Sequence, residues 1–181
     1  LCQIGAYLFV EPLFRGTQEA SALLPIVLRQ EAISAGLAGA AEGLARRQAL
    51  LAEAGIVPVE VALDRPLPEN LNVLFVAGLG PEISESLAVQ ARAAGILINV
   101  EDVPHLCDFH VPAAVRRGDL IITVSTGGKA PGLAKLIREW IEAKIGIEWS
   151  GRVREASQSR AKWRAAGEKP AEVSKRLRDY I

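Results

Sequence analysis

Residues 32–55 read AISAGLAGAAEGLARRQALLAEAG. The small apolar residues at 32–38 are typical of a strand, and a glycine-rich turn follows them before helical periodicity begins. That periodicity runs from Ala41 to Ala54, and Gly55 is a typical end for a helix. A strand, a glycine-rich turn and a helix in this order predict the first unit of an α/β protein.

The rest of the first hundred residues continues this alternation. Further strands are predicted at 57–63, 72–77 and 96–100, and a helix is predicted at 82–94. Strands that alternate with helices indicate a parallel sheet with helices on both faces. The predicted fold class is therefore α/β, with a doubly wound parallel sheet.

The pattern changes after this region. A short crossing element is predicted at 111–115, a strand at 120–124 and a strongly amphipathic helix at 132–144. The apolar stripe of this helix is wide enough to require a partner, which in a chain of this size could be a second copy of the chain. The stripe consists of Leu133, Leu136, Ile137, Trp140 and Ile141.

The composition of the 181 residues is that of a globular protein without net charge. Hydrophobic residues make up 50% of the chain, which suffices for a core, and 21 basic residues balance 21 acidic ones. This balance argues against a dedicated nucleic-acid binder. Residues 151–181, which read as one or two polar helices, are basic. Such a tail is most often a solvated face, but it could also contact an acidic partner or an anionic ligand.

Cysteine and histidine give no sign of a disulfide framework or a metal site. The chain has two cysteines, Cys2 and Cys107. His105 and His110 flank Cys107, but strand and turn geometry would scatter these side chains, so no metal is predicted. Residues 1–14 are apolar yet interrupted, too short for a bilayer span and without signal-peptide features. We expect a cytoplasmic protein that does not bind a membrane.

The glycine-rich turn raises the question of a dinucleotide site. Such a site needs glycines between the first strand and its helix, because a side chain there would hold the pyrophosphate away from the backbone N–H groups. The turn at 36–43 is correctly placed, but it is not G-x-G-x-x-G. Asp64, at the end of the second predicted strand, stands where an acid would bind the ribose hydroxyls. The other interpretation is a tight turn whose small residues serve packing alone.

A second set of polar residues follows the later strands. One strand delivers two adjacent carboxylates, Glu101 and Asp102, and the next runs into Ser-Thr-Gly-Gly-Lys at 125–129. Adjacent strand residues point to opposite faces, so one of the two acids can face a given cleft. Asp102 fits the position of a general base, with Glu101 and Asp108 as rivals. The other interpretation of Asp102 is a surface turn acid or a helix cap.

The order and spacing of the later motifs resemble the precorrin-2 dehydrogenase family, the N-terminal part of siroheme synthase. The resemblance runs from about residue 23 to about 149 and is carried by Asn99-Val-Glu-Asp102, Cys107-Asp-Phe109 and Ser125-Thr-Gly-Gly-Lys-Ala-Pro131. It implies NAD-dependent oxidation of precorrin-2 to sirohydrochlorin, and some members also insert ferrous iron. It also implies a Rossmann-like domain, a homodimer and Asp102 as the essential catalytic carboxylate.

The resemblance also implies the binding residues. The second key glycine of the family turn aligns with Ala41 of this chain. The expected NAD-binding residues are Gly39, Ala41, Glu42, Gly43, Leu63, Asp64 and Gly78. A substrate with eight carboxylates needs cations and hydrogen-bond donors, and Arg138 is one candidate cation. The other expected substrate-binding residues are Ser125, Thr126, Gly127, Gly128, Lys129, Arg116 and Arg117.

Two departures from the family fall on the nucleotide half. The link at 64–71 is too short for a βα unit that the family has there, so the Rossmann-like sheet is shortened on that side. The next strand ends in Gly78-Leu79-Gly80 instead of the family's Thr-Asp/Asn turn. Two alternatives therefore stay open: a tetrapyrrole-binding protein or chelatase without dinucleotide-dependent activity, and a regulatory module unrelated to tetrapyrroles. The expected domains are an extension at 1–22, an NAD-binding domain at 23–112, a dimerisation region at 113–150 and a helical tail at 151–181.

Overall fold

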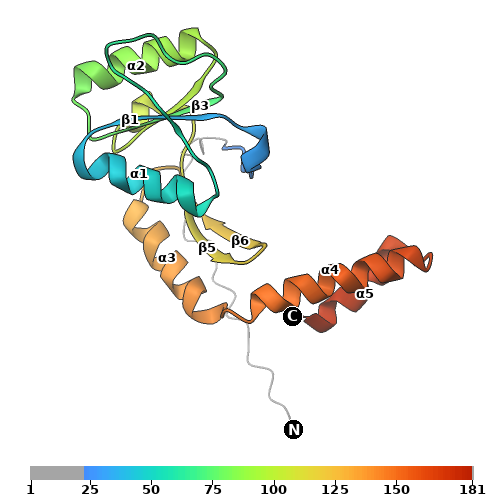
Figure 1. The fold of residues 1–181 in the computed structure, drawn as a ribbon. Helices are drawn as coiled ribbons and strands as arrows, with labels where there is room; N and C mark the ends of the chain where they lie inside the picture. Colours follow the sequence, from blue (N-terminus) through green and yellow to red (C-terminus); the bar gives the residue numbers. More distant parts are fainter. Residues whose placement is uncertain (1–22, 181) are drawn as a thin grey trace, which may run out of the picture.

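The computed structural model describes residues 23–180 (Figure 1). The extension expected at 1–22 and the last residue, Ile181, lie outside the described residues. The chain forms a parallel sheet with a helix on each face, then a two-stranded hairpin beside a third helix, and last a pair of C-terminal helices that projects away from the sheet.

Four parallel strands form the main sheet, in the order β2-β1-β3-β4. Helix α1 (Ala41–Glu53) connects β1 to β2, and helix α2 (Pro81–Ala93) connects β3 to β4. From β1 the chain moves to β2 on one side, and it then crosses to β3 and β4 on the other side of β1. Because both crossovers are right-handed, the two helices lie on opposite faces of the sheet. The predicted doubly wound α/β fold is confirmed. The strands are β1 (Ala35–Gly39), β2 (Val59–Glu60), β3 (Val73–Ala77) and β4 (Leu97–Val100).

Each face of the sheet has its own apolar core. Leu37 and Phe75 pack with Leu51 on the α1 face. On the α2 face, Leu74 and Ile98 are fully buried within a larger cluster. Because both faces are covered, the strands read as continuous apolar runs rather than as alternating ones.

An extended link joins β2 to β3, where the resemblance led us to note a missing βα unit. Val61 and Leu71 in this link are buried on the α2 face, and Leu67 packs against the same cluster. The link therefore covers the sheet where a helix would otherwise lie. β2 pairs with β1 alone and is two residues long, so the strand predicted at 57–63 is too long. As a consequence Asp64 lies beyond the end of β2 rather than at it.

The hairpin and the last helices follow β4 and a 3-10 turn, η2 (Pro104–Leu106). The hairpin consists of β5 (Ala113–Arg117) and β6 (Leu120–Val124), joined at Gly118, whose φ of 60° suits glycine. The short crossing element predicted at 111–115 is found as β5, which begins two residues later, after Pro112, which has no N–H to donate. The helices that follow are α3 (Pro131–Lys144), α4 (Trp149–Ala165) and α5 (Pro170–Arg176), and short 3-10 turns are η1 (Gln30–Ala32) and η3 (Leu177–Tyr180).

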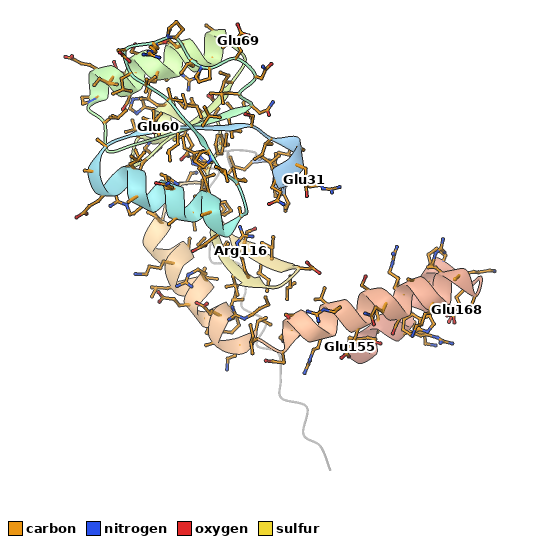
Figure 2. All side chains as sticks on the ribbon, in the orientation of Figure 1. Glu31, Glu60, Glu69, Arg116, Glu155 and Glu168 are labelled. Atoms are coloured by element: carbon orange, nitrogen blue, oxygen red, sulfur yellow. The ribbon has the colours of Figure 1, made fainter. Side chains whose placement is uncertain are left out.

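Helices α4 and α5 lie against each other as an arm (Figure 1). Tyr180 donates a hydrogen bond from its hydroxyl to Ser159 at 2.8 Å, and Arg176 lies over the ring of Trp163. Figure 2 shows Glu155 and Glu168 on this arm, far from the sheet. The one or two polar helices expected at 151–181 are thus two, separated by a turn between Ala165 and Pro170.

Candidate functional site

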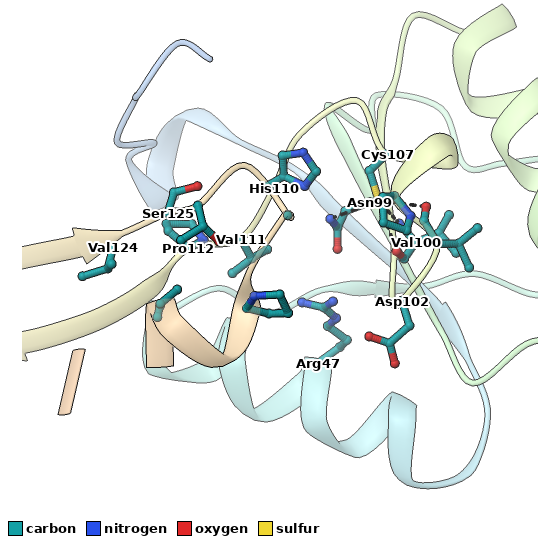
Figure 3. Close-up of a pocket in the computed structure, with 17 residues that line it drawn as sticks. Arg47, Asn99, Val100, Asp102, Cys107, His110, Val111, Pro112, Val124 and Ser125 are labelled. Carbon is teal, nitrogen blue, oxygen red and sulfur yellow. Dashed lines mark hydrogen bonds between the residues drawn. The ribbon is translucent and has the colours of Figure 1, made fainter. Parts of the chain in front are cut away.

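A cavity of about 410 Å³ lies at the carboxyl end of β4, between the sheet and the hairpin (Figure 3). Sites for small molecules commonly measure about 300–1,000 Å³, so this volume is large enough for part of a sizeable ligand. Its walls come from α1, the turn after β4, the end of β6 and the start of α3. The polar residues of the wall include Arg47, Asn99, Asp102, His110, Ser125 and Thr126.

Asp102, the predicted base, lies on this wall. β4 ends at Val100, and Asp102 then adopts the left-handed region with φ 61°. Aspartate tolerates this region better than most residues, yet the conformation is sparsely populated. The tight turn leaves the carboxylate beside the cavity at the end of the strand. The structure therefore places Asp102 on the cavity wall, at the carboxyl end of β4.

The two rival acids have structural partners. Glu101 accepts hydrogen bonds from the guanidinium of Arg46, at 3.0 and 3.5 Å, and thereby ties the turn after β4 to α1. Asp108 accepts the backbone N–H of Ile98 at 3.1 Å and a bond from Arg92 at 3.0 Å. Neither carboxylate lines the cavity. Asp102 is therefore the acid of the three that is available to a ligand.

Cys107 and Asn99 fasten the loop after β4 to the strand. The thiol of Cys107 donates to the carbonyl of Val100 at 3.1 Å, and the N–H of Val100 donates to the sulfur at 3.3 Å. Asn99 donates from Nδ2 to the carbonyl of Phe109 at 2.9 Å. Burial raises the pKa of the Cys107 thiol, against the opposing effects of the Val100 bond and the charge of Arg47. The thiol is thus a neutral fastening group.

The Ser-Thr-Gly-Gly loop forms the opposite wall. Ser125, Thr126 and Gly128 line the cavity, whereas Gly127 does not. The Gly127 N–H donates to Ser125 Oγ at 3.2 Å, and the Ala130 N–H donates to Thr126 Oγ1 at 3.2 Å. These bonds shape the loop, and each hydroxyl keeps its own O–H as a donor.

The expected substrate cations lie outside the cavity wall. Arg117 donates to the carbonyls of Ile145 and Glu142, at 2.8 and 3.2 Å, and so caps the end of α3. Arg116 is exposed on the hairpin (Figure 2), and Lys129 is exposed on its loop. Arg138 pairs with acids of its own helix. The predicted role of these cations in substrate binding stays a prediction without support from their positions.

The glycines of the turn allow α1 to pack tightly against the end of β3. A Cβ at Gly39 would come within 2.6 Å of the Ala77 carbonyl, one at Gly43 within 2.8 Å of the Gly78 nitrogen, and one at Gly78 within 2.5 Å of the Ala40 carbonyl. Glycine alone therefore permits this close approach of α1 to β3, at the point where the strand order reverses. The structure thus brings Gly39, Gly43 and Gly78 together.

Ala41 has a φ of 50°, in the region that favours glycine. The turn therefore keeps a glycine-type backbone although the residue carries a methyl group. Glu42 follows in the first turn of α1, almost fully exposed. The residues at this turn fit a pyrophosphate at a helix N-terminus through their N–H groups, with the Ala41 methyl and the Glu42 charge as local obstacles.

Leu63 and Asp64 lie in the link that follows β2. Leu63 lines a second hollow of about 260 Å³ together with Ile83, Ser86 and other residues of α2. Asp64 is exposed in the link that follows β2. The predicted contact of these two residues with the cofactor stays a prediction.

Sequence reasoning missed Arg47, Asn99 and His110 as cavity residues. Arg47 stood on the polar side of a predicted helix, where most cations are solvated. Asn99 belonged to a recognised motif but was given no role. The available signal was the position of Asn99 next to the acids, at the carboxyl end of a buried strand.

Within residues 23–180, no helix has the length and apolarity needed to cross a bilayer. In the same part of the chain, no three His, Cys, Asp or Glu side chains are grouped so that they could hold a metal ion.

Fold and site together define an α/β domain of the nicotinamide-dinucleotide-binding class. Residues 21–113 match the family described as "Putative NAD(P)-binding", and residues 117–144 match the one described as "Sirohaem biosynthesis protein central". The chain therefore belongs to the NAD(P)-binding family of siroheme biosynthesis, as its motifs indicated.

Individual relatives agree with this assignment. The chain is 32% identical over 170 residues to a siroheme synthase of Methylococcus capsulatus, covering 81% of this chain and 36% of the relative. It is 33% identical over 115 residues to the siroheme biosynthesis protein met8 of Schizosaccharomyces pombe, covering 64% and 44%. The chain thus spans less than half the length of these relatives. The solved structure of SirC, precorrin-2 dehydrogenase, has the same fold, with a TM-score of 0.67, 16% identity and coverage of 88% and 89%.

Proposed function

We propose that this chain catalyses the NAD-dependent oxidation of precorrin-2 to sirohydrochlorin. The observation that carries the proposal is the position of Asp102, whose carboxylate lies on the wall of a cavity of about 410 Å³ opposite the Ser125 loop. The glycine turn that suits a dinucleotide lies at the neighbouring strands of the same sheet edge. Family membership supports the same reaction.

The reaction removes one hydride and one proton from the macrocycle. When bound, the nicotinamide supplies the hydride acceptor. Asp102 accepts the proton on a carboxylate oxygen, since it lines the cavity while Glu101 and Asp108 are held by arginines. The hydroxyls of Ser125 and Thr126 face the same space and donate to acidic side chains of the substrate.

Asp102→Asn tests this assignment. We expect kcat to fall by about 100-fold or more, because the substitution replaces the basic carboxylate by an amide of nearly equal volume that cannot accept the proton. Sirohydrochlorin binding, followed by visible absorbance, should change less than a few-fold, and the fold should be intact by circular dichroism. Asp119→Asn, an exposed acid in the hairpin turn, is the matched control. Normal turnover in Asp102→Asn would rule out Asp102 as the proton acceptor.

A second function is favoured by a specific observation. The methyl group of Ala41 and the absent βα unit weaken the nucleotide half while the cavity is intact. The alternative is a tetrapyrrole-binding protein or chelatase that inserts ferrous iron as substrate, with Asp102 taking the pyrrole protons. Thermal unfolding with millimolar NAD separates the two, because a bound cofactor raises the midpoint. A midpoint unmoved by NAD, together with iron insertion in its absence, would favour the chelatase.

We propose NAD rather than NADP as the cofactor. The carboxylate of Asp64 lies in the segment after β2, where a 2′-phosphate would bring a second negative charge. Equal affinity for both dinucleotides would contradict this choice.

A further inference from the structure

Arg47 is a half-buried cation on the cavity wall. Its side chain is 16% exposed, whereas that of Arg46, its neighbour on α1, is 59% exposed. Its Nε atom is inaccessible to solvent and has no hydrogen-bond partner among residues 23–180. A guanidinium keeps its charge at every relevant pH, so an unpaired buried donor carries an uncompensated loss of hydration. Such a group is stabilised when an anion enters the cavity.

Glu101, the acid closest to Arg47, does not satisfy it. Nε of Arg47 lies 3.8 Å from Glu101 Oε1, which is too long for a hydrogen bond. Arg46, in contrast, donates hydrogen bonds to both carboxylate oxygens of Glu101. Glu101 thus forms hydrogen bonds with Arg46 and not with Arg47, and the guanidinium of Arg47 lines the cavity (Figure 3).

Asn99 adds a second unpaired atom to the same wall. Its side chain is 5% exposed, and Oδ1 has no hydrogen-bond partner in the described part of the chain. The bond from Nδ2 to the Phe109 carbonyl, at 2.9 Å, fixes the orientation of the amide. Arg47 and Asn99 do not bond to each other in the structure. Two polar atoms without a hydrogen bond, Arg47 Nε and Asn99 Oδ1, belong to residues that line one cavity, which indicates a ligand that brings polar atoms of its own.

We infer that Arg47 binds a side-chain carboxylate of the tetrapyrrole substrate inside the cavity. The inference rests on the proposed function. The anion is assigned to the substrate and not to the cofactor, because the pyrophosphate site is the N-terminus of α1 at Ala41, about 9 Å from Arg47 along the helix axis. Arg47 shares its wall with Asp102 instead. Holding one acidic side chain of the ring there would fix which ring edge meets the base.

Arg47→Gln tests the inference, with Arg47→Lys as a second variant that keeps the charge and loses the planar fork. Direct titration with sirohydrochlorin should show about 10- to 100-fold weaker binding for Arg47→Gln and a smaller loss for Arg47→Lys. The NAD dissociation constant should stay within about two-fold. Arg154→Gln, an exposed arginine on α4, is the control for the same change of charge.

A second ligand isolates the ion pair. With the octamethyl ester of sirohydrochlorin, wild type and Arg47→Gln should bind equally, because no carboxylate is left to pair. Equal binding of the free acid by both proteins would overturn the role of Arg47 while leaving the proposed function in place. An equal loss of NAD and tetrapyrrole affinity would assign Arg47 to the cofactor or to the fold and would also overturn it. Failure of the wild type to bind sirohydrochlorin would overturn the proposed function itself.

Discussion

At the scale of single residues, the site depends on backbone conformations that its side chains do not favour. Ala41 and Asp102 both have positive φ, at 50° and 61°, and both stand at a turn that follows a strand of the sheet. Strain of this kind costs about 1–3 kcal/mol per residue and persists where the surrounding structure enforces it. Ala41 borders the proposed cofactor site and Asp102 the proposed substrate site, so both strained residues lie at proposed binding sites.

Ala41→Gly should strengthen NAD binding by several-fold. The substitution removes the methyl group from the turn and relieves about 1–2 kcal/mol of left-handed strain. The greater freedom of glycine in the unfolded chain offsets about 0.4–1 kcal/mol of that gain. We therefore expect unchanged or slightly higher stability, measured by urea unfolding, and a lower NAD dissociation constant by calorimetry.

Ala45→Gly is the matched control for this change. Ala45 is exposed within α1, where glycine lowers the free energy of unfolding by about 1 kcal/mol. The two substitutions should therefore change the free energy of unfolding with opposite sign or by clearly different amounts. Loss of about 1 kcal/mol in Ala41→Gly as well would show that the turn is not strained.

At the scale of elements, Arg117 joins the hairpin to α3. Its guanidinium donates to the Ile145 and Glu142 carbonyls, which the end of the helix leaves without intrahelical partners. Arg117→Met keeps the apolar stem and removes these bonds. We expect a loss of about 1–3 kcal/mol in the free energy of unfolding, measured with urea. The exposed neighbour Arg116→Met should lose less than about 0.5 kcal/mol, and similar losses in both would contradict the capping role.

Prediction from sequence succeeded where local patterns decide and failed where distant contacts decide. The helix expected at 82–94 is found at Pro81–Ala93, because proline at the first position and the apolar face are local signals. The strand expected at 57–63 is two residues long, because its length depends on a second neighbouring strand, and the part of the chain that the structure describes provides none beside β2. Likewise Asp102 could be placed by its motif. Arg47 could not be found, since its burial depends on the segments that complete the cavity.

At the scale of the whole molecule, the outer face of α3 is apolar and is left exposed by the other residues of 23–180. Leu133, Leu136 and Trp140 are 52%, 63% and 65% exposed, although the sequence stripe to which they belong is typical of a buried helix face. The inner side of the same helix contacts the hairpin, and its start lines the cavity. An exposed apolar stripe on an ordered helix indicates an interface.

We expect the chain to form a two-fold dimer through this stripe, as the sequence analysis proposed. A two-fold axis brings the same stripe of both copies together and lets one helix cover the other. Light scattering coupled to size exclusion should give twice the chain mass of 19.4 kDa for the wild type and the single mass for Leu136→Glu. The change places a carboxylate in the centre of the interface, where burial without a partner is strongly unfavourable.

Val57→Glu is the control for the dimer, because Val57 is 91% exposed on a different part of the surface. It introduces the same charge at an exposed apolar residue and should leave the dimer intact. Dissociation by both variants would indicate a general effect of charge rather than an interface at α3. A wild type that is monomeric at tens of micromolar would remove the dimer from the proposal. The cavity, Asp102 and Arg47 would then have to act within one chain, which their common wall permits.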